Sequence, residues 1–184
     1  MKCLATVVAL ALVVYGFSAV LSIGGNAAAL GAAQAQGAKD IDGSVKQCLR
    51  VMELKYETPS DGVYEIKDEQ YSLRYHVFKQ DERLMVLVVL NEKVPARFRP
   101  AVIEYLTRIN YGAMVIGNFE MDLSDGEVQF RTSVDVEHGS INPEMVAQMT
   151  QLAVGYTEQY GPGIDELYKG KTPEQVFDAI SADN

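Results

Sequence analysis

The sequence contains little of what catalytic and metal-binding sites are built from, with two cysteines and two histidines among its 184 residues. Cys3 lies in an apolar leader and Cys48 in the body, so removal of the leader leaves Cys48 without a partner for an internal disulfide. His76 stands alone and His138 has only Glu137 beside it, whereas a metal site needs three or four converging ligands. Neither a G-x-S-x-G nor an H-E-x-x-H pattern occurs. The sequence therefore predicts no catalytic residue, no cofactor and no metal.

Basic residues are also in short supply, because 16 Lys and Arg stand against 25 Asp and Glu, for a formal net charge of −9. All the acidic residues follow residue 38, and Lys2 is the only base before Lys39. A body this acidic repels phosphate groups, so it is not expected to bind nucleic acid or anionic lipid through its surface charge. The acidity itself is typical of a soluble domain.

The first 38 residues form a separate, nearly uncharged segment. Residues 3–23 are an uncharged apolar run, and Ala33-Gln34-Ala35 is a candidate signal-peptide cleavage site. The run also approaches the roughly 20 residues of a membrane-spanning helix, so a retained anchor (residues 1–23) is the alternative. Residues 24–38 suit a cleavage region or a flexible linker. Both interpretations predict a periplasmic or other extracytoplasmic body, residues 39–184, with membrane contact if the segment stays uncleaved.

The body contains several segments with strand periodicity. Apolar and polar residues alternate over residues 71–77, and the continuous apolar run at 84–90 is typical of a central strand covered on both faces. Two further strands, 114–123 and 127–136, flank a Ser-Asp-Gly turn that favours a hairpin. One face of the first hairpin strand is expected to carry Val115, Phe119, Met121 and Leu123. These segments predict an antiparallel sheet.

Helical periodicity surrounds these strands. It appears over residues 39–55, over residues 95–112 and again after Asn142, a candidate N-cap. The apolar stripe expected on the helix after Asn142 is Met145, Met149, Leu152, Tyr156 and Tyr160. Beyond a Gly-Pro-Gly break, Thr172 and Gln175 form a candidate capping box for a last short helix. The order of elements predicts an α+β fold, with helices packed on one face of the antiparallel sheet.

The hairpin loop from Asp122 to Glu127 has the opening spacing of a calcium-binding loop. An EF-hand loop is flanked by helices and places a bidentate Glu at its twelfth position. Here strands flank the loop, and the twelfth residue counted from Asp122 is Ser133. The residues therefore predict a turn rather than a cation site.

The same hairpin carries a candidate partner surface. Asn118, Glu120 and Asp122 alternate along one strand, and the predicted turn brings Arg131 close to them from the other strand. Two interpretations stay open: a cross-strand charge pair that only sets the register, and a polar surface that contacts a partner.

Tyrosines near the Gly-Pro-Gly break are the second candidate for that surface. Tyr156 and Tyr160 precede the break and Tyr168 follows it. Aromatic side chains of this kind line grooves that hold a protein segment, or they cap the core beneath the last helices.

Residues 94–180 carry a family resemblance. The most specific parts are L-T-R-I-N-Y-G at residues 106–112 and I-G-N-F-E-M-D-L-S-D-G-E-V-Q-F-R-T-S at residues 116–133. With the long helix and the K-T-P-E-Q-V-F-D-A-I that follow, these stretches resemble the YbjN family of bacterial sensory transduction regulators. The resemblance implies a fold like that of type III secretion chaperones, protein binding, homodimers and no defined catalytic residues. The apolar leader departs from the soluble members of that family.

These observations favour a non-enzymatic protein-binding or regulatory module with a protein partner, chaperone-like in action and either exported or membrane-tethered. Two alternatives stay open: a small-ligand carrier of the cell envelope, and an enzyme whose site residues are scattered along the sequence. A carrier predicts a large apolar cavity, whereas an enzyme predicts a deep polar pocket with perturbed ionisable groups.

Overall fold

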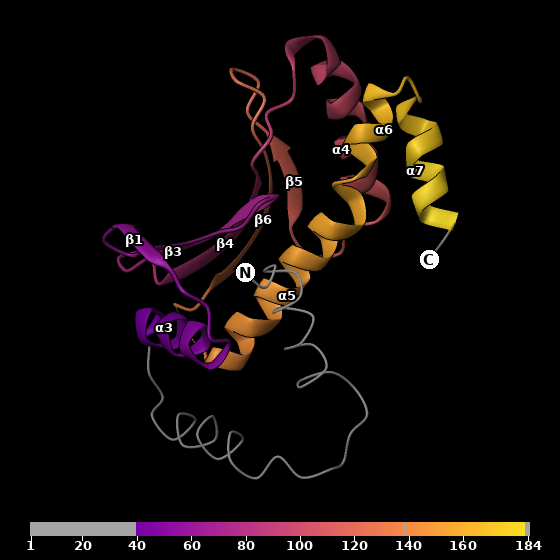
Figure 1. The fold of residues 1–184 in the computed structure, drawn as a ribbon. Helices are drawn as coiled ribbons and strands as arrows, with labels where there is room; N and C mark the ends of the chain where they lie inside the picture. Colours follow the sequence, from indigo (N-terminus) through magenta and orange to yellow (C-terminus); the bar gives the residue numbers. More distant parts are fainter. Residues whose placement is uncertain (1–39, 138, 183–184) are drawn as a thin grey trace.

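The computed structural model describes residues 40–137 and 139–182 (Figure 1). The predicted leader and linker, and His138, lie outside the described residues. The described part contains an antiparallel sheet with the strand order β1-β2-β3-β4-β6-β5. Its strands are β1 (Glu57–Ser60), β2 (Val63–Lys67), β3 (Tyr71–Phe78), β4 (Arg83–Leu90), β5 (Asn118–Met121) and β6 (Val128–Asp135).

Helices cover one face of this sheet. They are α3 (Ile41–Val51), the short 3₁₀ helix η2 (Ala96–Phe98), α4 (Arg99–Gly112), α5 (Pro143–Tyr160), α6 (Gly163–Tyr168) and α7 (Pro173–Ala182). In Figure 1, α3 and α5 lie along the sheet, α4 packs beside β5, and α6 and α7 lie against α4. The predicted α+β class, with helices on one face of an antiparallel sheet, is confirmed.

The core lies between α5 and the centre of the sheet. Leu73 and Tyr75 of β3 pair with Val88 and Val86 of β4, and all four side chains are fully buried. The Tyr75 hydroxyl shares a 2.8 Å hydrogen bond with Thr150 Oγ1 of α5, which satisfies both polar atoms inside the core. The predicted alternation in β3 and the predicted central position of β4 are both confirmed.

The opposite face of the sheet carries charged side chains. The register places Glu65, Arg74, Leu87, Arg131 and Asn118 in one row across β2, β3, β4, β6 and β5. Arg74 Nε donates a 2.7 Å hydrogen bond to Glu65 Oε1, and this bond together with the arginine charge holds the pKa of Glu65 below its usual range. We call this surface the open face. It carries the polar residues of the β5–β6 hairpin on the side away from α5.

Helix ends follow the capping signals in the sequence. Asn142 Oδ1 accepts a 2.8 Å hydrogen bond from Met145 N at the start of α5. At α7, Thr172 N donates to Gln175 Oε1 at 3.0 Å and Gln175 N donates to Thr172 Oγ1 at 3.3 Å. The predicted N-cap and capping box are confirmed, because each satisfies backbone N–H groups that the helix leaves unpaired.

The buried stripe of α5 differs from the predicted one. Its buried side chains are Val146, Thr150, Ala153, Val154, Thr157 and Tyr160, with Pro143 at its start. The prediction is right for Tyr160 and wrong for Met145, which is 37% exposed; Met149, Leu152 and Tyr156 are partly buried. Thr150 and Thr157 fit inside the core because each hydroxyl donates a 2.8 Å hydrogen bond to a carbonyl one turn earlier. A prediction from hydrophobicity alone therefore places the buried face of α5 part of a turn away from where it lies.

The first hairpin strand is shorter than predicted. Residues 114–123 were expected to form it, but β5 contains only residues 118–121. Gly117 has φ +78°, and a Cβ at this position would lie 2.6 Å from a backbone oxygen of β6. Extended pairing therefore stops at Gly117, since this left-handed conformation is not that of a strand. Val115 and Leu123, expected on the buried face, are 88% and 64% exposed.

The strand β1 is absent from the sequence-based expectations. Residues 61–62 form a tight turn, and the residues before it form the strand β1. β1 pairs with β2 only at Glu57 and Ser60, with an irregular register between them. Four exposed residues that include a proline carry no strand periodicity, so their pairing could not be read from the sequence.

Candidate functional site

Polar side chains of the β5–β6 hairpin meet on the open face. The Glu120 carboxylate accepts hydrogen bonds from Asn118 Nδ2 and Gln129 Nε2, both at 3.0 Å, and forms an ion pair with Arg131. The cross-strand contact predicted for Arg131 is therefore present. The Arg131 and Glu120 side chains are 44% and 28% exposed, so the pair contributes at most about 1 kcal/mol. Because its own neighbours already engage the carboxylate, this cluster is a polar surface rather than a chelating site.

Asp122, the remaining polar residue predicted for this surface, bonds within the hairpin turn instead. Its Oδ1 accepts from Ser124 Oγ at 2.7 Å and from Ser124 N at 2.8 Å. These two bonds hold the pKa of Asp122 below its usual range. The turn is closed by backbone bonds of 2.8 Å from Asp122 N to Glu127 O and from Gly126 N to Asp122 O. The loop is thus a turn, as predicted.

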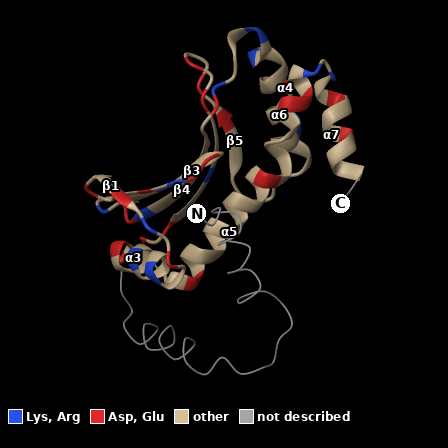
Figure 2. Cartoon of the chain, viewed as in Figure 1, with Lys and Arg blue, Asp and Glu red and all other residues tan. Residues whose placement is uncertain are grey.

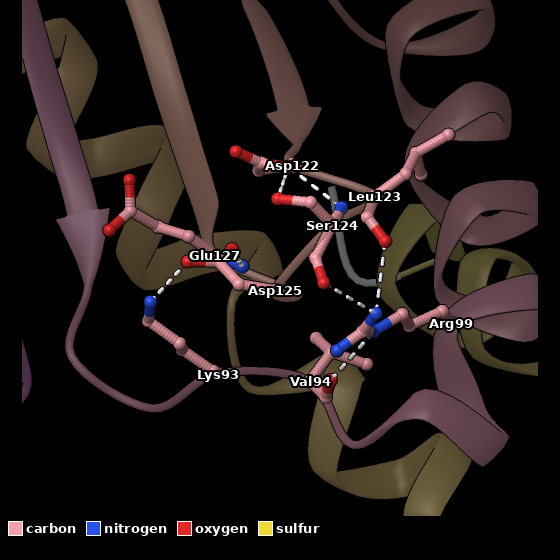
Figure 3. A network of polar contacts seen from close by, with 8 residues as sticks. All are labelled: Lys93, Val94, Arg99, Asp122, Leu123, Ser124, Asp125 and Glu127. Atoms are coloured by element: carbon pink, nitrogen blue, oxygen red, sulfur yellow. Dashed lines mark hydrogen bonds and ion pairs between the residues drawn. The ribbon is translucent and has the colours of Figure 1, made fainter.

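This turn is docked against the connection between β4 and α4 (Figure 3). Val94 N donates a 2.8 Å hydrogen bond to Gly126 O. The Arg99 guanidinium donates to Val94 O at 3.2 Å and to the carbonyl oxygens of Leu123 and Ser124 at 2.9 and 3.3 Å. An ion pair joins Lys93 to Asp125 and lowers the pKa of that carboxyl. The far end of the hairpin is therefore tied to the rest of the fold by backbone and side-chain contacts.

The tyrosines predicted for the same surface lie on the other side of the sheet. Tyr160 is 5% exposed, and its carbonyl oxygen accepts a 2.8 Å hydrogen bond from the Tyr105 hydroxyl. The ring centroids of Tyr156 and Phe130 are 5.4 Å apart. Phe130 is buried on the helix side of β6, whereas its neighbour Arg131 lies on the open face. The structure thus brings Asn118, Glu120 and Arg131 together and places both tyrosines beneath the sheet.

An exposed apolar surface lies at the other end of β5. Tyr111, Val115 and Ile116 are 95%, 88% and 53% exposed, and we call these three residues the apolar tip. Single apolar residues are common on protein surfaces, whereas several exposed in one short segment make that segment a candidate contact site. The tip was not predicted from the sequence, because Val115 was expected on a buried strand face. The sequence feature that could have indicated the tip is the absence of any charged residue between Arg108 and Glu120.

The apolar tip is held at both ends. Phe119 N donates to Asn110 Oδ1 at 2.8 Å, and Asn110 Nδ2 donates to Phe119 O at 2.9 Å, so one side chain joins the end of α4 to β5. Gly112 lies against the Phe177 ring of α7, where an added Cβ would be 2.8 Å from the ring. A loop that is fixed before binding loses less conformational entropy when a partner contacts it.

His76 lies on the open face, away from other ligand-type groups. Its Nε2 is buried and has no hydrogen-bond partner among the described residues. Burial, and then the charge of Arg74, hold the pKa of His76 below its usual value, so the imidazole is neutral at pH 7. Within residues 40–137 and 139–182, no three His, Cys, Asp or Glu side chains are grouped to hold a metal ion. No helix in those ranges is both long and apolar enough to cross a membrane.

These features define an α+β protein whose sheet is covered by helices on one face and carries polar pairs on the other. The chain belongs to the YbjN family, described as "Putative bacterial sensory transduction regulator", which matches over residues 44–166. This match confirms the family resemblance seen in the sequence. No curated protein matches the chain.

Solved structures similar to this chain include a family member and two protein complexes. YbjN from E. coli has a TM-score of 0.49 at 11% identity, covering 80% of this chain and 97% of that one. The ExoT–SpcS complex from Pseudomonas aeruginosa gives 0.43 at 11%, covering 64% and 93%. The Yersinia pestis type III secretion chaperone SycH, in complex with a stable fragment of YscM2, gives 0.45 at 8%, covering 64% and 97%.

Proposed function

We propose that this chain is a non-enzymatic, protein-binding module of the YbjN family that contacts its partner through the apolar tip. The observation that carries the proposal is the exposure of Tyr111, Val115 and Ile116 in one uncharged segment. Burying a Val or Ile side chain against a partner stabilises a complex by about 1.5–3 kcal/mol. The tip is held by Asn110 and Phe119, so this gain is not offset by ordering a flexible loop.

A chaperone-like or regulatory action belongs to the same proposal, as the family membership suggests. Such an action requires contact with another protein and needs no catalytic group. The small-ligand carrier and the enzyme remain the competing classes, and no specific feature of the described residues favours either.

Site-specific photo-cross-linking in the cell of origin tests the proposal. A photoreactive phenylalanine analogue introduced at Val115 should give an adduct with a second protein, because this side chain is 88% exposed within the tip. The same analogue at Leu123, 64% exposed at the opposite end of β5, should give little of that adduct. Denaturing gels and mass spectrometry of the adducts provide the measurement.

The outcomes of this experiment separate the proposal from its competitors. Equal adducts from Val115 and Leu123, or none from either, would contradict contact through the apolar tip. An adduct of twice the mass of the chain would show that the tip serves self-association instead. In that case the partner would be a second copy of the chain, in agreement with the homodimers that the family resemblance implies.

We further propose that residues 3–23 direct the body out of the cytoplasm, as a cleaved signal or as a retained anchor. The support is their uncharged apolar sequence behind Lys2. Alkaline phosphatase fused after residue 38 should be active in a bacterial host, because that enzyme needs an oxidising compartment for its disulfides. A matched fusion lacking residues 3–23 should be inactive. Equal activity of the two fusions would overturn this location.

A further inference from the structure

The apolar tip has acidic neighbours on α7. The Phe177 ring lies against Gly112, which follows Tyr111 in α4, so α7 packs against the end of α4 that leads into the tip. Glu174 and Asp178 are exposed on this helix, and neither forms an ion pair within the described residues. Figure 2 shows acidic positions along α6 and α7 on this side of the molecule. Helix α7 therefore carries, near the tip, two carboxylates that form no ion pair among the described residues, and the Arg108 charge acts on both from a greater distance.

The basic residues closest to the tip along the chain are already engaged. Arg108, one turn before Tyr111, forms an ion pair of 2.8 Å with Glu104. The pKa of Arg108 is raised by its hydrogen bond to Glu104, and beyond that by the charges of Glu104, Glu174 and Asp178. Beyond β5, Arg131 is paired with Glu120. The charge that remains around the apolar tip is negative.

We propose that the occupant of the apolar tip is a partner-protein segment in which apolar side chains alternate with lysine or arginine. This inference rests on the proposed function and adds the chemistry of the partner to it. Apolar side chains of the segment cover the tip and supply most of the affinity. Its cations face Glu174 and Asp178 at the rim, where complementary charge selects the partner and speeds association.

Charge also argues against two other occupants. A second copy of the chain placed tip to tip by a two-fold axis would bring the α7 carboxylates of both copies toward the same interface. An anionic lipid surface would meet the same carboxylates with like charge. Only a basic segment turns these groups into a favourable contact.

Fluorescence anisotropy with a synthetic probe tests the inference on the full-length chain. The probe is a labelled peptide in which leucine alternates with lysine, and its counterpart has glutamate in place of each lysine. The lysine peptide should bind, more weakly at high salt, and the glutamate peptide should not. The double variant Val115→Ser/Ile116→Ser should weaken binding about tenfold or more. Glu174→Gln/Asp178→Asn should weaken it about fivefold and reduce the salt dependence.

Matched controls make the test specific. Leu123→Ser removes an apolar side chain that is 64% exposed outside the tip, and Glu69→Gln/Asp81→Asn removes two exposed acids on other loops. Both should bind the lysine peptide like the natural chain. Equal binding of the two peptides, or equal losses in the control variants, would overturn the basic-segment inference. If those results appear while Val115 still cross-links to a partner, the protein-binding function stands and only the partner chemistry is wrong.

Discussion

Replacing Gly126 with alanine should lower the free energy of unfolding by at least about 2 kcal/mol. Gly126 has φ +89°, a left-handed conformation that costs an L-residue with a Cβ. An added Cβ would also lie 2.3 Å from Val94 O, an oxygen that already accepts a hydrogen bond from Arg99. Because Val94 lies in the β4–α4 connection and Arg99 begins α4, the turn that carries Gly126 must move away from that connection. Urea denaturation followed by circular dichroism measures the loss.

Gly155→Ala is the matched control, and its expected effect has the opposite sign. Gly155 is exposed in the middle of α5, and an added Cβ would meet nothing within 4 Å. Alanine there should raise the free energy of unfolding by about 0.5–1 kcal/mol, because it restricts the unfolded chain and favours the helix. If the two variants shifted the midpoint of urea denaturation in the same direction, the left-handed conformation assigned to Gly126 would be wrong.

Replacing Asn110 with alanine should cost about 2–3 kcal/mol of unfolding free energy. The Asn110 amide makes two hydrogen bonds to the Phe119 backbone, on the outer edge of β5. Without them, the N–H and C=O of Phe119 lose their partners in a partly buried position, and the edge strand becomes open to pairing with other chains. Hydrogen exchange at the Phe119 amide, followed by NMR, should be faster in the variant. The increase in exchange rate, converted to a free energy, should equal the loss of unfolding free energy.

The control for this second prediction is Asn118→Ala on the same strand. Among the described residues, Asn118 Nδ2 bonds to the partly exposed Glu120 carboxylate on the open face, so its loss should change stability by less than about 0.5 kcal/mol. Exchange at the Phe119 amide should stay slow in this variant. Equal acceleration in both variants would mean that Asn110 does not protect the edge of β5.

Local signals in the sequence predicted the elements that depend on nearby residues. Asn142 caps α5 and Thr172 caps α7 because each side chain reaches a backbone N–H three residues away. The Ser-Asp-Gly turn is present for the same reason, since the Asp122 and Asp125 side chains bond within it. The cross-strand contact of Glu120 with Arg131 followed from the position of that turn.

The candidate site was predicted less completely, because its exposure depends on neighbours that are distant in sequence. Alternation placed Val115 on the same face as Phe119, yet the strand stops at Gly117, where β6 approaches too closely for a side chain. The tyrosines of α5 were assigned by helical spacing alone, which does not say which layer covers them. Tyr160 contacts Phe119 and Tyr156 contacts Phe130, so the sheet is the layer that covers them.

By itself the sequence determined the class of the fold, the order of its longer helices and of strands β3 to β6, the predicted caps and the hairpin turn. Its capping and turn signals rest on interactions within a few residues. Tertiary structure alone decided where β5 ends, which way α5 faces and which apolar residues stay exposed. It also decided that Asn110 closes the edge of β5 and that Arg99 holds the hairpin turn. The physical reason is that the burial of a side chain and the hydrogen bonds of a polar group depend on the residues that pack against them. Here those residues belong to helices and strands that are distant in the sequence.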